Sequence, residues 1–110
     1  MVIALACKEK DQVAERFTLA QTFTIYKVDF GHIGSPTIVF QENETPAMLL
    51  RGYGVDLVIC GRIGRTAGQS LMDEGIKFFG GVSGRSDQVL ASYLAGTLEA
   101  AFDFTDHEEE

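Results

Sequence analysis

The second half of the chain alternates strand-like runs with helix-like segments, and this alternation constrains the fold more than any other feature. The apolar runs 55–60 ("VDLVIC") and 76–80 ("IKFFG") predict strands. Between them, residues 64–74 predict a helix that is closed by Gly75. From residue 87 to about 101, apolar side chains recur at helical spacing: Val89, Leu90, Tyr93, Leu94 and Leu98. A strand–helix–strand–helix order requires parallel strands joined by right-handed crossovers.

The first half of the chain predicts strands joined by hairpins. Residues 2–7 form a continuous apolar run, 8–15 are polar and predict a loop, and 22–30 alternate in a way that favours a strand. A turn rich in glycine leads to an antiparallel strand at 37–40. Thr45 and Pro46 then predict the start of a helix that ends at Gly52 or Gly54. The predicted fold class is α/β and ribonuclease H-like. It has three antiparallel strands, then βαβα, in a mixed five-stranded sheet with flanking helices, whose first, fourth and fifth strands are parallel.

Negative charge is concentrated in residues 103–110 ("DFTDHEEE"), which hold five acidic residues and no basic one. Elsewhere eleven acidic residues face nine basic ones. We therefore expect a single domain over residues 1–102 and an acidic, disordered tail over 103–110. Nucleic-acid binding is not expected without a basic excess, and no apolar run reaches the length of a membrane helix. The run before Cys7 is too short for a signal peptide, so we expect a cytoplasmic protein.

The predicted topology locates a ligand site, because open α/β sheets bind ligands beyond the carboxyl ends of their parallel strands. Three loops converge there: those after Cys7 and Cys60, and the loop 80–86. The loop "GRIGRTAG" is not a P-loop, since GxxxxGK[ST] is absent. Four of the five arginines map to this end of the sheet: Arg16, Arg62, Arg65 and Arg85. With the helix N-termini they predict an anion site; the alternative is that they pair with neighbouring acidic residues.

Two cysteines suggest a second kind of site. Cys7 and Cys60 each end a strand predicted to be parallel and adjacent, so their sulfurs could approach one another and bind a metal or an iron–sulfur cluster. The alternative is that each thiol packs as a small apolar group. His32 and His107 are read as incidental polar residues.

Catalysis by a ribonuclease H-type mechanism is not expected. That chemistry needs several carboxylates around two metal ions, one of them on the first strand, and "VIALAC" contains none. Asp56 lies at the wrong end of its strand. We also find no combination of nucleophile and base, and so predict that the chain is not an enzyme.

From Val55 onward, "VDLVICGRIGRTAGQSLMDEGIKFFGGVSGRSDQVLASYLAGTL" resembles the dinitrogenase iron–molybdenum cofactor biosynthesis family of small ribonuclease H-like domains. The matching residues are Gly61, Gly64, Leu71, Gly75, Ile76, Phe79, Gly84, Tyr93, Gly96 and Leu98. Upstream, "ERFTLAQTFTIYKVD" matches more loosely at Glu15, Phe17, Ala20 and Phe23. The resemblance implies a non-catalytic protein that binds or carries an iron–sulfur or iron–molybdenum type cofactor, with a possible protein partner in cofactor assembly.

The chain departs from the family pattern at three positions. Arg16 replaces the histidine expected before Phe17, Thr18 replaces the next glycine, and Arg62 replaces the second glycine of Gly-Gly-x-Gly. A soft ligand is thus exchanged for cations that cannot ligate metal, so we expect a pocket suited to anions. The predicted binding residues are Arg16, Gly61, Arg62, Gly64, Arg65, Gly81, Gly84 and Arg85, with Cys7 and Cys60 as metal candidates. The alternative function is a protein-interaction module with no bound cofactor.

Overall fold

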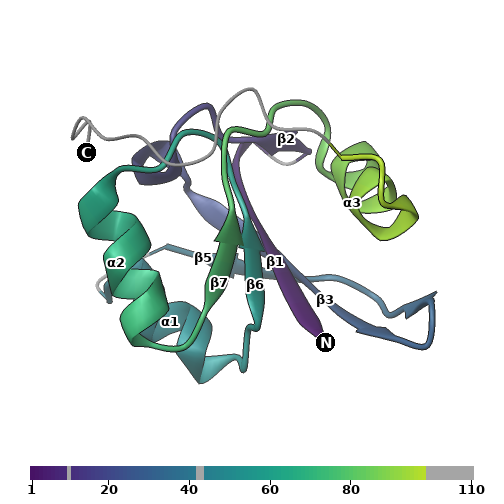
Figure 1. The fold of residues 1–110 in the computed structure, drawn as a ribbon, viewed down its shortest axis with the longest axis horizontal. Helices are drawn as coiled ribbons and strands as arrows, with labels where there is room; N and C mark the ends of the chain where they lie inside the picture. The colour runs from purple at the N-terminus through teal and green to yellow at the C-terminus, as the bar shows by residue number, and fades with distance from the viewer. Residues whose placement is uncertain (10, 42–43, 99–110) are drawn as a thin grey trace.

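A single mixed β-sheet organises the fold of the computed structural model, which describes residues 1–9, 11–41 and 44–98 (Figure 1). The long strands are β1 (Val2–Glu9) and β3 (Thr22–Asp29), followed by the shorter β5 (Thr37–Phe40), β6 (Leu57–Ile59) and β7 (Lys77–Phe79). Their order is β3-β1-β6-β7, with β5 against the outer edge of β3. β1 runs antiparallel to β3 and parallel to β6, and β6 runs parallel to β7. The predicted α/β class and the three parallel strands are confirmed.

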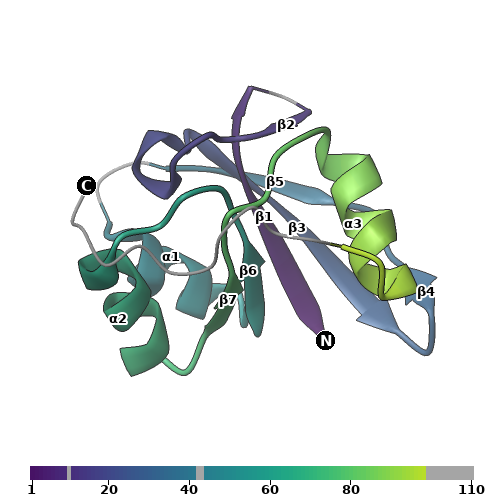
Figure 2. The same ribbon diagram turned by 45° about the horizontal axis from the view of Figure 1, so that its top comes forward.

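Helices cover both faces of the sheet (Figure 2). On one face lie α1 (Pro46–Gly52) and α2 (Arg65–Asp73); on the other lies α3 (Ser86–Ala95). The predicted cap of α1 is present, because the Thr45 hydroxyl accepts a hydrogen bond from the Met48 N–H at 3.4 Å. The start of α3 agrees with prediction but its end does not. α3 stops at Ala95 because Gly96 turns the chain with a left-handed φ of 77°.

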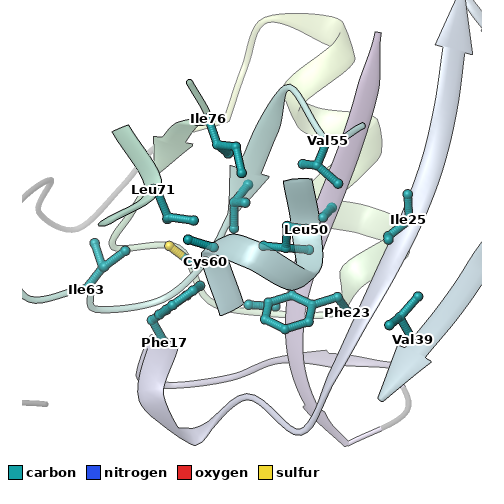
Figure 3. Close-up of a cluster of buried hydrophobic side chains, with 14 residues drawn as sticks. Phe17, Phe23, Ile25, Val39, Leu50, Val55, Cys60, Ile63, Leu71 and Ile76 are labelled. Atoms are coloured by element: carbon teal, nitrogen blue, oxygen red, sulfur yellow. The ribbon is translucent and has the colours of Figure 1, made fainter. Parts of the chain in front are cut away.

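The two faces carry two separate apolar clusters, as expected for a sheet buried on both sides. Along β1, Ala4 and Ala6 point to the α1/α2 face, whereas Ile3, Leu5 and Cys7 point to the α3 face. Figure 3 shows the cluster on the α1/α2 face, which contains Phe23 of β3 and Leu71 of α2. These clusters hold the carboxyl ends of the parallel strands in a fixed position.

Residues 8–15 were expected to be a loop, and this prediction is partly wrong. β1 continues to Glu9, and a two-residue strand, β2 (Gln12–Val13), pairs with it. The chain also forms β4 (His32–Ile33) and a short 3₁₀ helix, η1 (Phe17–Leu19), that composition did not indicate. Short elements of this kind depend on backbone pairing rather than on side-chain periodicity. The predicted tail 103–110, with His107, lies outside the described residues. Within the described ranges, every helix is too short or too polar to cross a membrane.

Candidate functional site

The segment 11–17 crosses the carboxyl ends of the parallel strands and ties two loops together. Two hydrogen bonds join this segment to the loop after β7: the Val13 N–H donates to the Gly84 carbonyl at 2.9 Å, and the Ser86 N–H donates to the Asp11 carbonyl at 2.8 Å. The loops after β6 and β7 also bond to each other, through the Gly81 N–H and the Gly61 carbonyl at 2.8 Å. The three loops named from the sequence therefore meet at one end of the sheet.

Arg16 and Arg62 are brought side by side by the backbone. They form a single parallel β-bridge, in which the Arg62 N–H donates to Glu15 O at 2.9 Å and the Phe17 N–H donates to Arg62 O at 2.7 Å. Residues paired in this way project their side chains to the same side. Both side chains are half-buried. The pairing therefore concentrates two permanent positive charges at one point of the surface.

The N-terminus of α2 adds to this positive region. Arg65 is its first residue, and Gly64 occupies the cap position without a side chain that could accept a hydrogen bond. Helix N-termini carry partial positive charge and N–H groups that lack acceptors within the helix. Arg16, Arg62 and Arg65 thus belong to one region, which we call the arginine cluster.

Arg85 does not belong to that cluster. It caps α3 on the opposite face of the sheet, and its Nε and Nη2 each lie 3.3 Å from the carboxylate oxygens of Asp87. The hydrogen bond from Arg85 lowers the pKa of Asp87, and the Gln88 N–H contributes in the same direction. For Arg85, pairing with an acidic neighbour is the interpretation that the structure supports.

Gly61 is a packing glycine. A methyl group at this position would overlap the carbonyl oxygens of Ala14 and Glu15 and lie 2.7 Å from the Glu15 carbonyl carbon. The absence of a side chain lets segment 11–17 lie directly on the loop after β6. Gly61 therefore shapes the site by close backbone contact.

Cys7 and Cys60 do not lie together, so the prediction that their sulfurs share a site is wrong. The parallel register pairs Leu5 with Ile59, which places Cys60 one residue and Cys7 two residues beyond that pair. Because side chains alternate along a strand, the two thiols point to opposite faces. Cys7 lies in the cluster on the α3 face and Cys60 in that on the α1/α2 face (Figure 3).

Both thiols are completely buried and stay protonated at neutral pH. Burial raises the pKa of Cys60 to about 12. Burial also raises the pKa of Cys7, although hydrogen bonds with Thr24 and Ser86 oppose the shift. Across residues 1–9, 11–41 and 44–98, no three His, Cys, Asp or Glu side chains are grouped so that they could hold a metal ion. The donor set of the described residues therefore does not suit a cluster ligated by thiolates.

A groove of about 390 Å³ opens beside the arginine cluster, between η1, α1 and α2. Its apolar lining includes Phe17 and Phe23, whose ring centroids lie 6.1 Å apart. Its polar lining includes Thr18, Thr66 and Gln41. The Gln41 Nε2 donates to Glu44 O at 2.6 Å, whereas its buried Oε1 has no hydrogen-bond partner among the described residues.

The groove was not predicted from the sequence, because its walls come from five separate segments. One departure from the family pattern does coincide with the groove. Thr18, which replaces a glycine of the family pattern, lines the groove beside Phe17. His32, by contrast, is exposed in β4 at the far end of β3, consistent with an incidental polar residue.

Asp56 is used structurally at the opposite end of the sheet. Its carboxylate accepts a hydrogen bond from the Val2 N–H at 2.8 Å, and its own N–H donates to Val2 O at 2.8 Å. We expect Asp56→Ala to lower the free energy of unfolding by about 1 kcal/mol, the usual contribution of one such bond. Urea denaturation measures this effect. Asp73→Ala, at the exposed end of α2, is the control, and equal urea midpoints for the two variants would contradict the assignment.

Comparisons with known proteins agree with the fold. The model of the family described as dinitrogenase iron-molybdenum cofactor matches residues 1–96. No curated protein matches the chain. The solved structure of PH0822 is 21% identical with a TM-score of 0.87, over 94% of this chain and 98% of that one. A Thermotoga protein solved by NMR is 25% identical with a TM-score of 0.74, over 97% and 98%. The apo orange protein from Desulfovibrio gigas is 24% identical with a TM-score of 0.74, over 93% of each chain. With most of its length matched by the family model, this chain belongs to the dinitrogenase iron-molybdenum cofactor family.

Proposed function

We propose that this chain is a non-catalytic binding or carrier protein for an anionic ligand, which is held by the arginine cluster at the carboxyl ends of β1 and β6. The observation that carries the proposal is the β-bridge between Arg16 and Arg62 beside the N-terminus of α2. Two adjacent guanidinium groups can bind an oxyanion through paired, charge-assisted hydrogen bonds. The first turn of a helix favours the same kind of ligand.

The ligand class includes a preassembled, anionic metal–sulfur cofactor as well as a simple oxyanion. The description of the family names an iron–molybdenum cofactor. Arginine cannot ligate a metal, and Cys7 and Cys60 point to opposite faces. Any cluster carried here would therefore be held as an anion, through ion pairs and hydrogen bonds to its outer atoms.

Isothermal titration with molybdate and with tetrathiomolybdate tests this function directly. We expect the double variant Arg16→Gln/Arg62→Gln to bind at least about tenfold more weakly than the unmodified chain, because hydrogen bonds to charged groups contribute about 1.5–3 kcal/mol each. Arg51→Gln is the matched control. Arg51 is an exposed arginine that pairs with Glu74 at 2.8 Å and lies outside the cluster.

Three results would bear on the proposal in different ways. Equal affinities in the double variant and in Arg51→Gln would remove the arginine cluster as the binding site. If Cys60→Ser keeps its fold but loses binding, the binding site would instead lie at the cysteine thiols. If neither anion binds or raises the melting temperature, the anion-binding function is wrong, because a ligand that prefers the native state must stabilise it.

A second candidate, a protein-interaction module, is favoured by the outer edge of the sheet. β5 pairs only with β3 in the described part of the chain, and its Ile38 and Phe40 side chains are 47% and 65% exposed. Edge strands with exposed apolar side chains are typical docking surfaces for a partner strand. Ile38→Lys/Phe40→Lys would weaken such an interaction and leave anion binding unchanged, which separates the two functions.

A further inference from the structure

The outer edge of β5 presents backbone groups that no other strand pairs with in the described part of the chain. The Gln41 N–H donates to the Gln21 carbonyl at 2.9 Å, so the backbone of residue 41 points toward β3. Successive residues of an antiparallel strand direct their N–H and C=O groups to alternate sides. Val39 therefore also points toward β3, whereas Ile38 and Phe40 point outward. Both of these residues offer a donor and an acceptor to a further strand.

The side chains of the two outward residues form an exposed apolar strip on one face of the sheet. Ile38 lies opposite Thr24, which contacts Cys7 on the α3 face. Phe40 shares that face, because side chains two residues apart point the same way. The apolar cluster beneath α3 contains no residue of β5, and both side chains are exposed. Val39, between them, is buried on the opposite face and anchors the strand.

The edge lacks the charged residues by which edge strands commonly avoid pairing with one another. β5 has the sequence "TIVF", without a basic or an acidic side chain. Beside it, a hollow of about 470 Å³ is lined by one basic and one acidic residue, Lys8 and Glu9. A second copy of the same surface would therefore meet apolar side chains and balanced charges rather than like-charge repulsion.

The edge is complementary to itself in one antiparallel register. In a pairing centred on Val39, Ile38 of each copy lies opposite Phe40 of the other, and each such pair exchanges both N–H···O bonds. A β-branched side chain beside an aromatic ring is a favourable cross-strand combination. A register centred on Ile38 would instead pair Phe40 with Pro36, which has no N–H. A register centred on Phe40 would place Ile38 beyond the end of the other copy's strand.

We propose that β5 pairs with β5 of a second copy in the register centred on Val39, so that one continuous sheet crosses a twofold axis. This inference rests on the protein-interaction candidate, for which it names the partner, and it does not depend on anion binding. A strand edge of four residues buries far less than the roughly 800 Å² per partner of a standard interface, so the dimer is weak. We expect a dissociation constant on the order of 0.1–1 mM.

Sedimentation equilibrium of the full chain tests the association. The monomer mass is 12.0 kDa. At about 1 mM we expect a weight-average mass about 1.5-fold or more above that value, falling close to it at about 0.01 mM. Ile38→Lys/Phe40→Lys should stay monomeric at both concentrations, because the added ammonium groups would face each other across each pair.

Met48→Lys/Met72→Lys is the matched control. It adds the same charge at two apolar side chains of α1 and α2 that are 58% and 51% exposed. This variant should associate like the unmodified chain. A monomer mass for the unmodified chain at about 1 mM, or an equal loss of association in the two variants, would overturn the dimer.

Disulfide trapping tests the register. A chain carrying Ile38→Cys and a chain carrying Phe40→Cys are mixed and oxidised by dissolved oxygen, while Cys7 and Cys60 are completely buried and should not react. Opposite residues have Cα atoms about 5.5 Å apart, within reach of a disulfide, whereas diagonal ones lie about 7–8 Å apart. We expect at least about fivefold more of the mixed dimer than of either same-variant dimer. A statistical mixture of disulfide dimers would overturn the register.

Molybdate titration keeps this inference separate from the anion-binding function. Ile38→Lys/Phe40→Lys should bind molybdate as tightly as the charge-matched Met48→Lys/Met72→Lys, because the arginine cluster contains no residue of β5. Absence of molybdate binding to a chain that dimerises would refute the anion-binding function and leave the dimer intact. An unmodified chain that binds molybdate but stays monomeric at about 1 mM would do the reverse.

Discussion

Gly61→Ala is expected to prevent this chain from folding stably, whereas Gly52→Ala is expected to leave it folded. A Cβ atom at position 61 would overlap the backbone of Ala14 and Glu15, and backbone atoms cannot move aside as a flexible side chain can. The bridge between Arg16 and Arg62 depends on this contact, because Glu15 O accepts the Arg62 N–H at 2.9 Å. We expect a loss of more than about 4 kcal/mol, the range reserved for severe steric conflicts.

Gly52 provides the control because it is the last residue of α1 and an added methyl group there meets no atom within 4 Å. Alanine at a compatible position of this kind usually stabilises by up to about 1 kcal/mol, since it restricts the unfolded chain. Circular dichroism and amide dispersion report the fold, and urea midpoints report the stability. A folded Gly61→Ala variant with an unchanged midpoint would show that segment 11–17 does not press on the loop after β6.

Raising the pH above 9 is expected to lower the free energy of unfolding of this protein, because the buried Cys60 thiol resists ionisation in the folded chain. The pKa of the Cys60 thiol is about 12 in the folded chain, against an ordinary value of 9.0. Below pH 9 the thiol is protonated in both states, and its burial contributes fully. Between pH 9 and about 12 the unfolded chain ionises while the folded chain does not, so stability falls. The loss attributable to Cys60 reaches about 3 kcal/mol by pH 11, from about 1.4 kcal/mol per pH unit.

Cys60→Ala separates this effect from other groups that titrate in the same range. Burial also raises the pKa of Cys7 and of Tyr26, so both shift stability in the same direction. The alanine variant is expected to be less stable at pH 7, because it leaves a small cavity, but to lose stability less steeply between pH 9 and 11. Urea unfolding at closely spaced pH values measures both slopes. Parallel curves for the two proteins would mean that Cys60 ionises without unfolding.

The arginine cluster shows how sequence patterns and tertiary contacts combine in this site. The glycine-rich loop and the placement of Arg62 and Arg65 between β6 and α2 follow from local signals. That Arg16 lies beside Arg62 does not, because the two positions are 46 residues apart and meet only through a single bridge. The separation of Arg85 from the arginine cluster likewise depends on the position of α3 on the opposite face of the sheet.

The cysteines illustrate the effect of strand register. Both were expected to end a strand, but Cys7 lies two residues before the end of β1 and Cys60 directly follows β6. Their orientation depends on the pairing of Leu5 with Ile59, and a shift of one residue would have placed both thiols on the same face. Register is set by packing on both faces of the sheet at once. The sequence of one strand alone does not specify that packing.

The amino-acid sequence by itself determined the α/β class, the parallel arrangement of β1, β6 and β7, and the convergence of three loops at their carboxyl ends. These features follow from side-chain periodicity, helix caps and chain connectivity, which act over a few residues or through general rules of handedness. Only the tertiary structure decided the opposed cysteines, the contact at Gly61, the neighbouring arginines and the groove. All four depend on how closely backbones distant in sequence approach one another, and that distance is set by the packing of the whole core.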